Sequence, residues 1–153
     1  MAERHHTLAR WRERMTFDAY TTTGHHLILD ASPPNGDDRG PRPMELLLTA
    51  LSGCTGMDVL SILQKKREPV EAFEVYVEGV RAETHPKVFV EIDVLYRVTG
   101  NVKPESVERA IELSRDKYCG VSAMLHEIAR INYRYEILAG KGEQSEPATN
   151  SAA

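Results

Sequence analysis

Cysteine is scarce in this sequence, which has only Cys54 and Cys119 among its 153 residues. The N-terminal stretch is charged and has no apolar segment of the kind that a secretory signal requires, so we expect a cytoplasmic protein. Thiols in the cytosol are kept reduced. A structural disulfide is therefore not expected, whereas a transient catalytic disulfide is compatible with that compartment.

A basic excess is also absent. The formal net charge is −4 and the sequence pI is about 5.9, which argues against nucleic acid or an anionic membrane as a partner, since either favours a basic face. Hydrophobic residues make up 41% of the chain and charged residues 27%, as in ordinary soluble globular proteins. A chain of this length buries enough surface to fold as one domain without disulfides or metals.

Motifs for cofactors and metals are missing too. The sequence has no CxxC or HxxxH spacing. The adjacent pairs His5-His6 and His25-His26 point to opposite faces of a strand, where they do not converge on one ion. The GCTG segment around Cys54 lacks the lysine of a phosphate-binding loop. We predict no bound cofactor and no metal site.

Residue patterns predict strands where apolar and polar residues alternate and helices where apolar residues recur at helical spacing. The expected strands are Leu8–Arg12, Met15–Tyr20, His25–Asp30, Ala72–Glu83, Lys87–Thr99 and Ile131–Leu138. The expected helices are Met44–Leu63, Pro104–Lys117 and Cys119–Arg130. In the fifth strand, Val88 and Val90 are expected on the same face as Ile92, and the THPK connection before it predicts an antiparallel hairpin.

The first helix is apolar enough to raise the question of a membrane span. It carries Glu45 and Asp58, and two carboxylates in one span cost several kcal/mol in lipid. A helix that is apolar nearly all round is more typical of the buried centre of a soluble protein. We therefore expect the helix to form the core, with no membrane as partner.

Strands grouped before and after helices are typical of an α+β protein with mainly antiparallel sheet. No repeats or internal boundaries interrupt the chain, so residues 1–138 are expected to form a single domain. The segment 139–153 is rich in Gly, Glu, Ser and Ala and has no apolar run. We predict that this tail is disordered.

The chemistry of the two cysteines depends on their local settings. Cys119 begins a predicted helix, whose free N–H groups and dipole favour a thiolate. Cys54 lies in the middle of a helix, so a side chain from elsewhere, most plausibly an arginine, would be needed to lower its pKa. The alternative is that both are inert, because free cysteine is among the most buried residue types and packs as a small hydrophobe.

The runs PMELLLTALSGCTGMDVLSILQKKR and ERAIELSRDKYCGVSAML, separated by a strand pair, resemble the OsmC/Ohr family (osmotically inducible protein C / organic hydroperoxide resistance proteins). The resemblance covers roughly Trp11 to Leu138 and is most specific around Gly53-Cys54 and at Cys119–Ser122. It implies an OsmC-like fold, in which mainly antiparallel sheets wrap around a long central helix. That fold is an intertwined homodimer with its active sites at the subunit interface.

The resemblance also implies a cysteine-dependent peroxidase that reduces organic hydroperoxides in oxidative-stress defence. By that resemblance Cys54 is the thiolate that attacks the peroxide and becomes a sulfenic acid. Cys119 is the thiol that condenses with it to a disulfide. A dihydrolipoyl-type dithiol or a small thiol then reduces the pair by exchange.

Family peroxidases also place an Arg–Glu ion pair beside the reactive thiol, with the Glu directly after the helix-opening proline. Here Met44 has that position, and Glu45, one residue later, is the candidate catalytic acid. On a regular helix a nine-residue offset puts Glu45 nearly opposite Cys54. A role in offsetting the charge of the helix N-terminus is the alternative. The candidates for the cation are Arg10, Arg12, Arg14 and Arg42.

A different class of function remains open alongside the peroxidase. The same fold can serve as a non-catalytic dimeric binding module whose cysteines stay reduced and packed. Around Cys54, a set of apolar side chains would either line a site for alkyl hydroperoxides or fill the dimer core. These residues are Leu47, Leu48, Leu51 and Met57.

Overall fold

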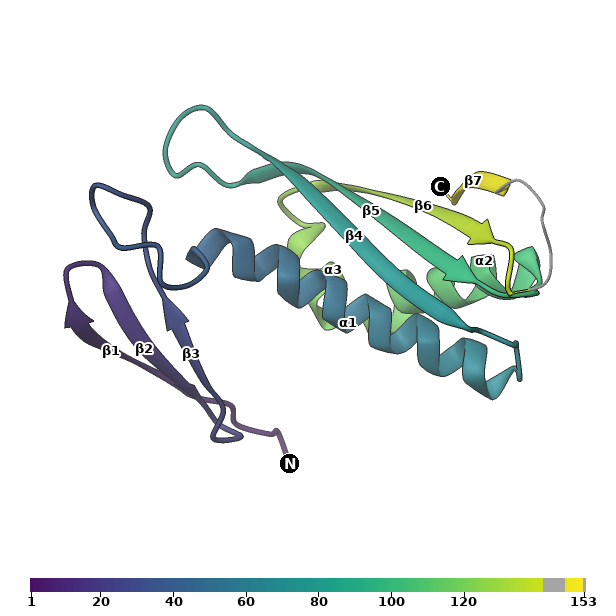
Figure 1. The fold of residues 1–153 in the computed structure, drawn as a ribbon, viewed down its shortest axis with the longest axis horizontal. Coiled ribbons are helices and arrows are strands. Elements are labelled where there is room, and N and C mark those ends of the chain that lie inside the picture. The colour runs from purple at the N-terminus through teal and green to yellow at the C-terminus, as the bar shows by residue number, and fades with distance from the viewer. Residues whose placement is uncertain (142–147, 153) are drawn as a thin grey trace. The chain divides into compact units, whose positions relative to one another are not determined.

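The computed structural model describes residues 1–141 and 148–152, which divide into two compact units, Met1–Leu47 and Leu48–Ala153. Helix α1 (Pro43–Lys65) begins in the first unit and continues in the second (Figure 1). The α+β class predicted from the sequence is confirmed, with one small sheet in each unit.

The first unit contains an antiparallel sheet in the order β1-β2-β3, formed by Thr7–Glu13, Thr16–Thr21 and His26–Leu29. Asp30 fixes the loop that follows. Its buried carboxylate accepts hydrogen bonds from the Ala31 and Arg39 amides, at 2.7 and 3.1 Å, and from the Thr16 hydroxyl at 3.1 Å. Burial alone raises the pKa of a carboxyl, but these hydrogen bonds outweigh it and the pKa of Asp30 lies below its ordinary value.

Helix α1 starts at a proline, whose missing N–H costs nothing in the first turn. The Glu45 carboxylate accepts a hydrogen bond from the Arg42 amide at 2.9 Å, so it satisfies one of the free donors at the helix start. Further along, small and apolar residues recur three or four positions apart and form the buried face of the helix. They are Leu51, Thr55, Gly56, Val59 and Leu63.

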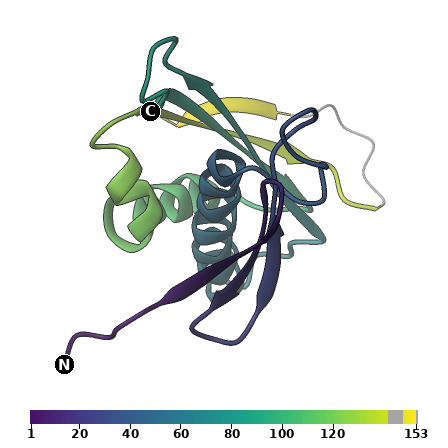
Figure 2. The same cartoon turned by 90° about the vertical axis from the view of Figure 1, so that its left-hand side faces the viewer.

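The second unit contains a four-stranded sheet in the order β4-β5-β6-β7. The strands are Ala72–Arg81, Phe89–Thr99, Arg130–Leu138 and Ala148–Ala152. β4 and β5 form the expected antiparallel hairpin, whereas β5 and β6 are parallel. A parallel pair needs a crossover connection, which α2 and α3 supply. Figure 1 and Figure 2 show the helices of this unit on one face of the sheet.

The core of this unit is built on β5, where Ile92, Val94, Tyr96 and Val98 are fully buried. The expectation that Val88 and Val90 share this face is wrong, because both are exposed while Phe89 is buried. The pairing register between β4 and β5 shifts at Val80/Arg81. Such a bulge adds a residue to one strand and turns the following side chains to the other face.

The segment after β5 differs from the two long helices predicted there. An α-helix, α2 (Pro104–Leu113), passes into one π-helical turn over Ser114–Tyr118. Cys119 is then extended, and α3 spans only Gly120–Leu125. Side-chain periodicity cannot distinguish a single wide π turn from regular helix, although such turns are frequent at functional sites.

The C-terminal tail predicted to be disordered, 139–153, is only partly covered by the described residues. Residues 142–147 and 153 lie outside them. Ala148–Ala152 form β7, which pairs antiparallel with β6 through partners such as Tyr135↔Asn150. The single domain predicted for residues 1–138 stays a prediction.

Candidate functional site

The two cysteines, 65 positions apart in sequence, lie together in the second unit. Their sulfurs and a carboxylate oxygen of Asp58 all lie within 4.8 Å of one another. Cys54 and Asp58 come from the same face of α1, because residues four apart lie one above the other on a helix. Cys119 comes from the junction between the π turn and α3. Folding therefore creates a compact group of two thiols and one carboxylate.

The local structure at Cys119 depends on the π turn. Its amide donates to the Ser114 carbonyl at 2.8 Å and so closes that turn. Its sulfur accepts a hydrogen bond from the Ser122 amide at 3.3 Å, in the manner of a helix cap. The residue is 2% exposed, whereas Cys54 is half-buried, and neither is in a disulfide. Of the two sulfurs, that of Cys54 is therefore the more accessible.

Burial, together with the nearby Cys54 and Asp58, raises the pKa of the Cys119 thiol to about 11. The Ser122 amide acts in the opposite direction but is outweighed. The expectation that a helix start favours the Cys119 thiolate is therefore wrong. At neutral pH this residue is a protonated thiol.

A chain of buried hydroxyl groups supports the carboxylate of this group. The Ser114 hydroxyl donates to Asp58 at 3.0 Å and lies 2.8 Å from the Thr55 hydroxyl, which lies 2.6 Å from that of Tyr96. Burial raises the pKa of Tyr96, so its phenol stays neutral. The chain links α1, β5 and the π turn, and it fixes the orientation of Asp58.

A small pocket of about 230 Å³ opens beside Asp58. It is lined by Asp58, Ser61, Ile62, Lys65, Leu113 and Tyr118. Of the three grouped residues, Asp58 lines this pocket. A small solute in the pocket can therefore reach its carboxylate.

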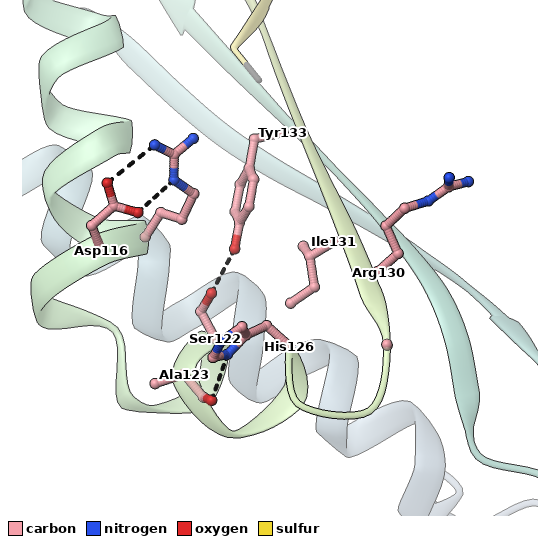
Figure 3. Close-up of a pocket in the computed structure, with 9 residues that line it drawn as sticks. Asp116, Ser122, Ala123, His126, Arg130, Ile131 and Tyr133 are labelled. Carbon is pink, nitrogen blue, oxygen red and sulfur yellow. Dashed lines mark hydrogen bonds and ion pairs between the residues drawn. The ribbon is translucent and has the colours of Figure 1, made fainter.

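A larger pocket of about 510 Å³ is lined by residues of the π turn, of α3 and of β6 (Figure 3). Its residues are Arg115, Asp116, Ser122, Ala123, His126, Ala129, Arg130, Ile131 and Tyr133. The Tyr133 hydroxyl lies 2.5 Å from that of Ser122, and Arg115 pairs with Asp116 at 2.7 Å. Ser122 therefore stands between this pocket and the Cys119 sulfur, to which its amide donates.

The other sequence candidates for the site lie in the first unit. Glu45 binds the Arg42 amide at the helix start, which is the alternative role given to it above. Arg12 pairs with Asp18, with its Nε 2.9 Å from the carboxylate, and Arg14 pairs with Asp37 at 3.1 Å. Arg42 pairs with Asp38. The structure thus assigns partners to three of the four candidate arginines within their own unit.

The apolar residues expected around Cys54 have different environments. Leu51 is fully buried and belongs to the core, so it does not line a site. Met57 is 76% exposed and Leu47 40% exposed. Only the exposed members are available to a ligand or to a second copy of the chain.

Sequence reasoning missed Asp58 as a partner of the thiols, although its spacing of four residues from Cys54 carried the signal. It also missed Thr55, Ser114 and Tyr96. Thr55 and Tyr96 are distant in sequence from Ser114 and Cys119, and only the packing of α1 against β5 and the π turn brings them together.

The fold and the site together define the class: an α+β protein with a long apolar helix and a pair of neighbouring thiols, one of which that helix contributes. The model of the family described as OsmC-like protein matches residues 36–139. Protein YhfA of Escherichia coli K12 is 40% identical over 131 residues, covering 85% of this chain and 96% of the relative. The chain therefore belongs to the OsmC-like family.

Solved structures agree with this assignment. A hypothetical protein from Aquifex aeolicus VF5 superposes with a TM-score of 0.81 at 33% identity, covering 90% of this chain and 98% of that one. An OsmC-like protein from Mycoplasma pneumoniae shares the fold with a TM-score of 0.78 at 17% identity, covering 90% and 99%. The predicted OsmC-like family and the predicted fold of the single chain are thus confirmed, whereas the homodimer stays a prediction.

Within the described residues, α1 is the one helix long and apolar enough to cross a membrane by length and composition. The core helix of a soluble protein meets the same test. Its residues Gly56 and Leu51 are buried, with Gly56 facing Val75 of β4. The expectation of a core helix agrees with this packing and with the family fold.

Proposed function

We propose that this protein is a cysteine-dependent thiol peroxidase that reduces organic hydroperoxides. The observation that carries the proposal is the approach of the Cys54 and Cys119 sulfurs to within 4.8 Å from distant parts of the sequence. Rotation of the side chains from such a separation allows the S–S bond of about 2.05 Å to form. Membership of the OsmC-like family supports a redox role for this pair.

The two thiols have different settings, which suggests different roles. The half-buried Cys54 is the proposed peroxidatic residue. Its thiolate attacks the peroxide, the O–O bond breaks, and the alcohol leaves with a proton while Cys54 becomes a sulfenic acid. The buried Cys119 thiol then attacks this sulfur. Its proton leaves with the sulfenic hydroxyl as water, and a Cys54–Cys119 disulfide remains.

A dithiol of the dihydrolipoyl type, or a small thiol, would complete the cycle by exchange with this disulfide. An apolar environment around Cys54, to which the exposed Met57 contributes, favours alkyl hydroperoxides over hydrogen peroxide. The cellular role is oxidative-stress defence in the cytoplasm. The working form is a homodimer, as in the family fold. Glu45 would contribute to catalysis only if a dimer partner brings its carboxylate to the reactive thiol.

The test measures how fast fully reduced protein consumes cumene hydroperoxide and hydrogen peroxide. The intact mass of the protein is measured in parallel under non-reducing conditions. We expect faster consumption of the organic peroxide and loss of two hydrogens from the monomer mass. No consumption, with both thiols still free, would overturn the peroxidase.

Matched serine variants separate the two roles. Cys54→Ser should abolish turnover, because the attacking sulfur is gone. Cys119→Ser should consume one equivalent of peroxide per chain and then stop at a sulfenic acid that dimedone traps. Continued turnover of Cys119→Ser with a dithiol would show that Cys119 is not the resolving thiol.

A non-catalytic binding module is the second candidate, and the raised pKa of Cys119 favours it, because a protonated buried thiol is unreactive. In that case both thiols stay reduced after peroxide treatment. Native mass spectrometry would then show co-purifying apolar material, which the peroxidase does not require.

A further inference from the structure

The thiol pair and its neighbouring carboxylate have a second chemical capacity. Cys54 Sγ, Cys119 Sγ and an Asp58 oxygen lie within 4.8 Å of one another and come from two separate elements. Thiolates and carboxylates are both zinc ligands, and three protein ligands with an open fourth position are the pattern of accessible zinc sites. We propose that the reduced protein binds one Zn²⁺ ion through Cys54, Asp58 and Cys119.

The spacing of the three atoms suits a tetrahedral ion. With Zn–S bonds of about 2.3 Å, two sulfurs on one tetrahedral zinc lie about 3.8 Å apart. The three atoms already lie within 4.8 Å, so shifts of about 1 Å bring them to bonding distance. The accessible thiol and the buried one thus need little rearrangement to bind one ion together.

Neighbouring residues orient the proposed ligands by hydrogen bonds. The Ser114 hydroxyl donates to Asp58 at 3.0 Å, and hydrogen bonds of this kind orient metal ligands. The Ser122 amide donates to the Cys119 sulfur at 3.3 Å and fixes its direction. The pocket of about 230 Å³ beside Asp58 gives an entry path and room for water as the fourth ligand.

Zinc binding releases the thiol protons, because the sulfurs bind the ion as thiolates. The divalent ion then reduces the three negative charges of two thiolates and one carboxylate to one. Zinc binding and peroxide reduction use the same sulfurs, so a bound ion shields both thiols from oxidation, and a disulfide prevents binding. The zinc site stands on geometry alone, and its test contains no peroxide.

The experiment uses reduced, metal-free protein titrated with Co²⁺ and then with Zn²⁺. We expect a sulfur-to-cobalt charge-transfer band that saturates at one ion per chain and is bleached by Zn²⁺. Cobalt bound only by nitrogen or oxygen ligands gives no such band. Zn²⁺ affinity is then measured by competition with a chromophoric chelator.

Three variants and one control test the ligands. Asp58→Asn keeps the size of the side chain and should weaken Zn²⁺ binding at least tenfold, whereas Asp93→Asn on β5 should leave it unchanged. Cys54→Ser and Cys119→Ser should each lose about half of the charge-transfer intensity. Because a serine variant can fail to fold, wild-type protein with alkylated thiols is the second test and should show no band.

Two results would overturn the proposal. The first is wild-type protein with no charge-transfer band at saturating Co²⁺. The second is an Asp58→Asn variant that binds Zn²⁺ as tightly as the wild type, which would exclude the three-ligand site. Either result leaves the peroxide assay unaffected, so failure of the zinc site and failure of the peroxidase are distinguishable.

Discussion

At the residue scale, environment rather than residue type distinguishes the two cysteines. Cys119 is at a helix start, the setting expected to favour a thiolate, yet its burial and its neighbours Cys54 and Asp58 raise its pKa. A short helix of six residues offers a weak field, and the single amide from Ser122 does not offset desolvation. A resolving thiol tolerates this protonation, because the sulfenic acid that it attacks forms on a sulfur within 4.8 Å of its own.

The raised pKa predicts slow alkylation of Cys119. A pKa of about 11 in place of 9.0 leaves about a hundredfold less thiolate at neutral pH, so iodoacetamide should modify Cys119 at least about a hundredfold more slowly in native than in unfolded protein. The rate should rise about tenfold per pH unit up to about 11. Peptide mapping of chelator-treated protein measures the rate at which Cys119 is alkylated. Equal rates in native and unfolded chains would contradict the prediction.

The same group links stability to pH. The native state holds the Cys119 proton more tightly than the unfolded state, so its contribution to stability is complete below about pH 9. As the pH rises from about 9 to about 11, the unfolded chain loses this proton first, and the free energy of unfolding decreases.

At the element scale, the hydroxyl chain between α1, β5 and the π turn joins three segments that are far apart in sequence. Thr55, Tyr96 and Ser114 are all buried, and each hydroxyl has a partner within the chain. Buried polar groups of this kind are costly when one partner is removed. The chain therefore fixes the position of the π turn on α1, and with it the position of Cys119.

Thr55→Val should destabilise the protein by about 1–3 kcal/mol, because the Tyr96 hydroxyl loses its buried partner without a change in side-chain shape. Tyr96→Phe removes that hydroxyl, so the double variant should cost less than the sum of the two single variants. Urea unfolding of the four proteins measures the coupling. Strict additivity would show that the two hydroxyls do not interact.

At the scale of the whole molecule, α1 is more apolar than one chain needs. Only 28% of its most apolar window is buried within the described structure, and Met57 is 76% exposed. Large exposed apolar surfaces mark interaction sites. The homodimer proposed above would place a second copy of this chain over the exposed apolar part of the helix.

Met57→Lys should therefore weaken the dimer, because a charge would be buried in an apolar interface. We expect dissociation at protein concentrations at least tenfold higher than for the wild type, a change equivalent to about 1.4 kcal/mol or more. Sedimentation velocity over a concentration series measures it. Glu112→Gln, which also raises the net charge by one unit, on the exposed face of α2, is the control and should not change the dimer. An unchanged dimer with Met57→Lys would place the interface elsewhere.

Much of the fold follows from local pattern. The alternation in β4 and β5, the proline starts of α1 and α2 and the apolar run over Met44–Leu63 all predicted elements that the structure shows. The failures have a common cause. The bulge that exposes Val90 and the π turn before Cys119 are one-residue changes in register, which leave no mark on hydrophobic periodicity.

The sequence by itself determined the α+β class, the family and the presence of two cysteines in specific motifs, because these depend on composition, spacing and local pattern. Only the tertiary structure brought Cys119 next to Cys54 and Asp58, and only burial raised the pKa of the Cys119 thiol. Proximity between distant segments and loss of solvent both arise from packing. A site made from two such segments therefore exists only in the folded chain.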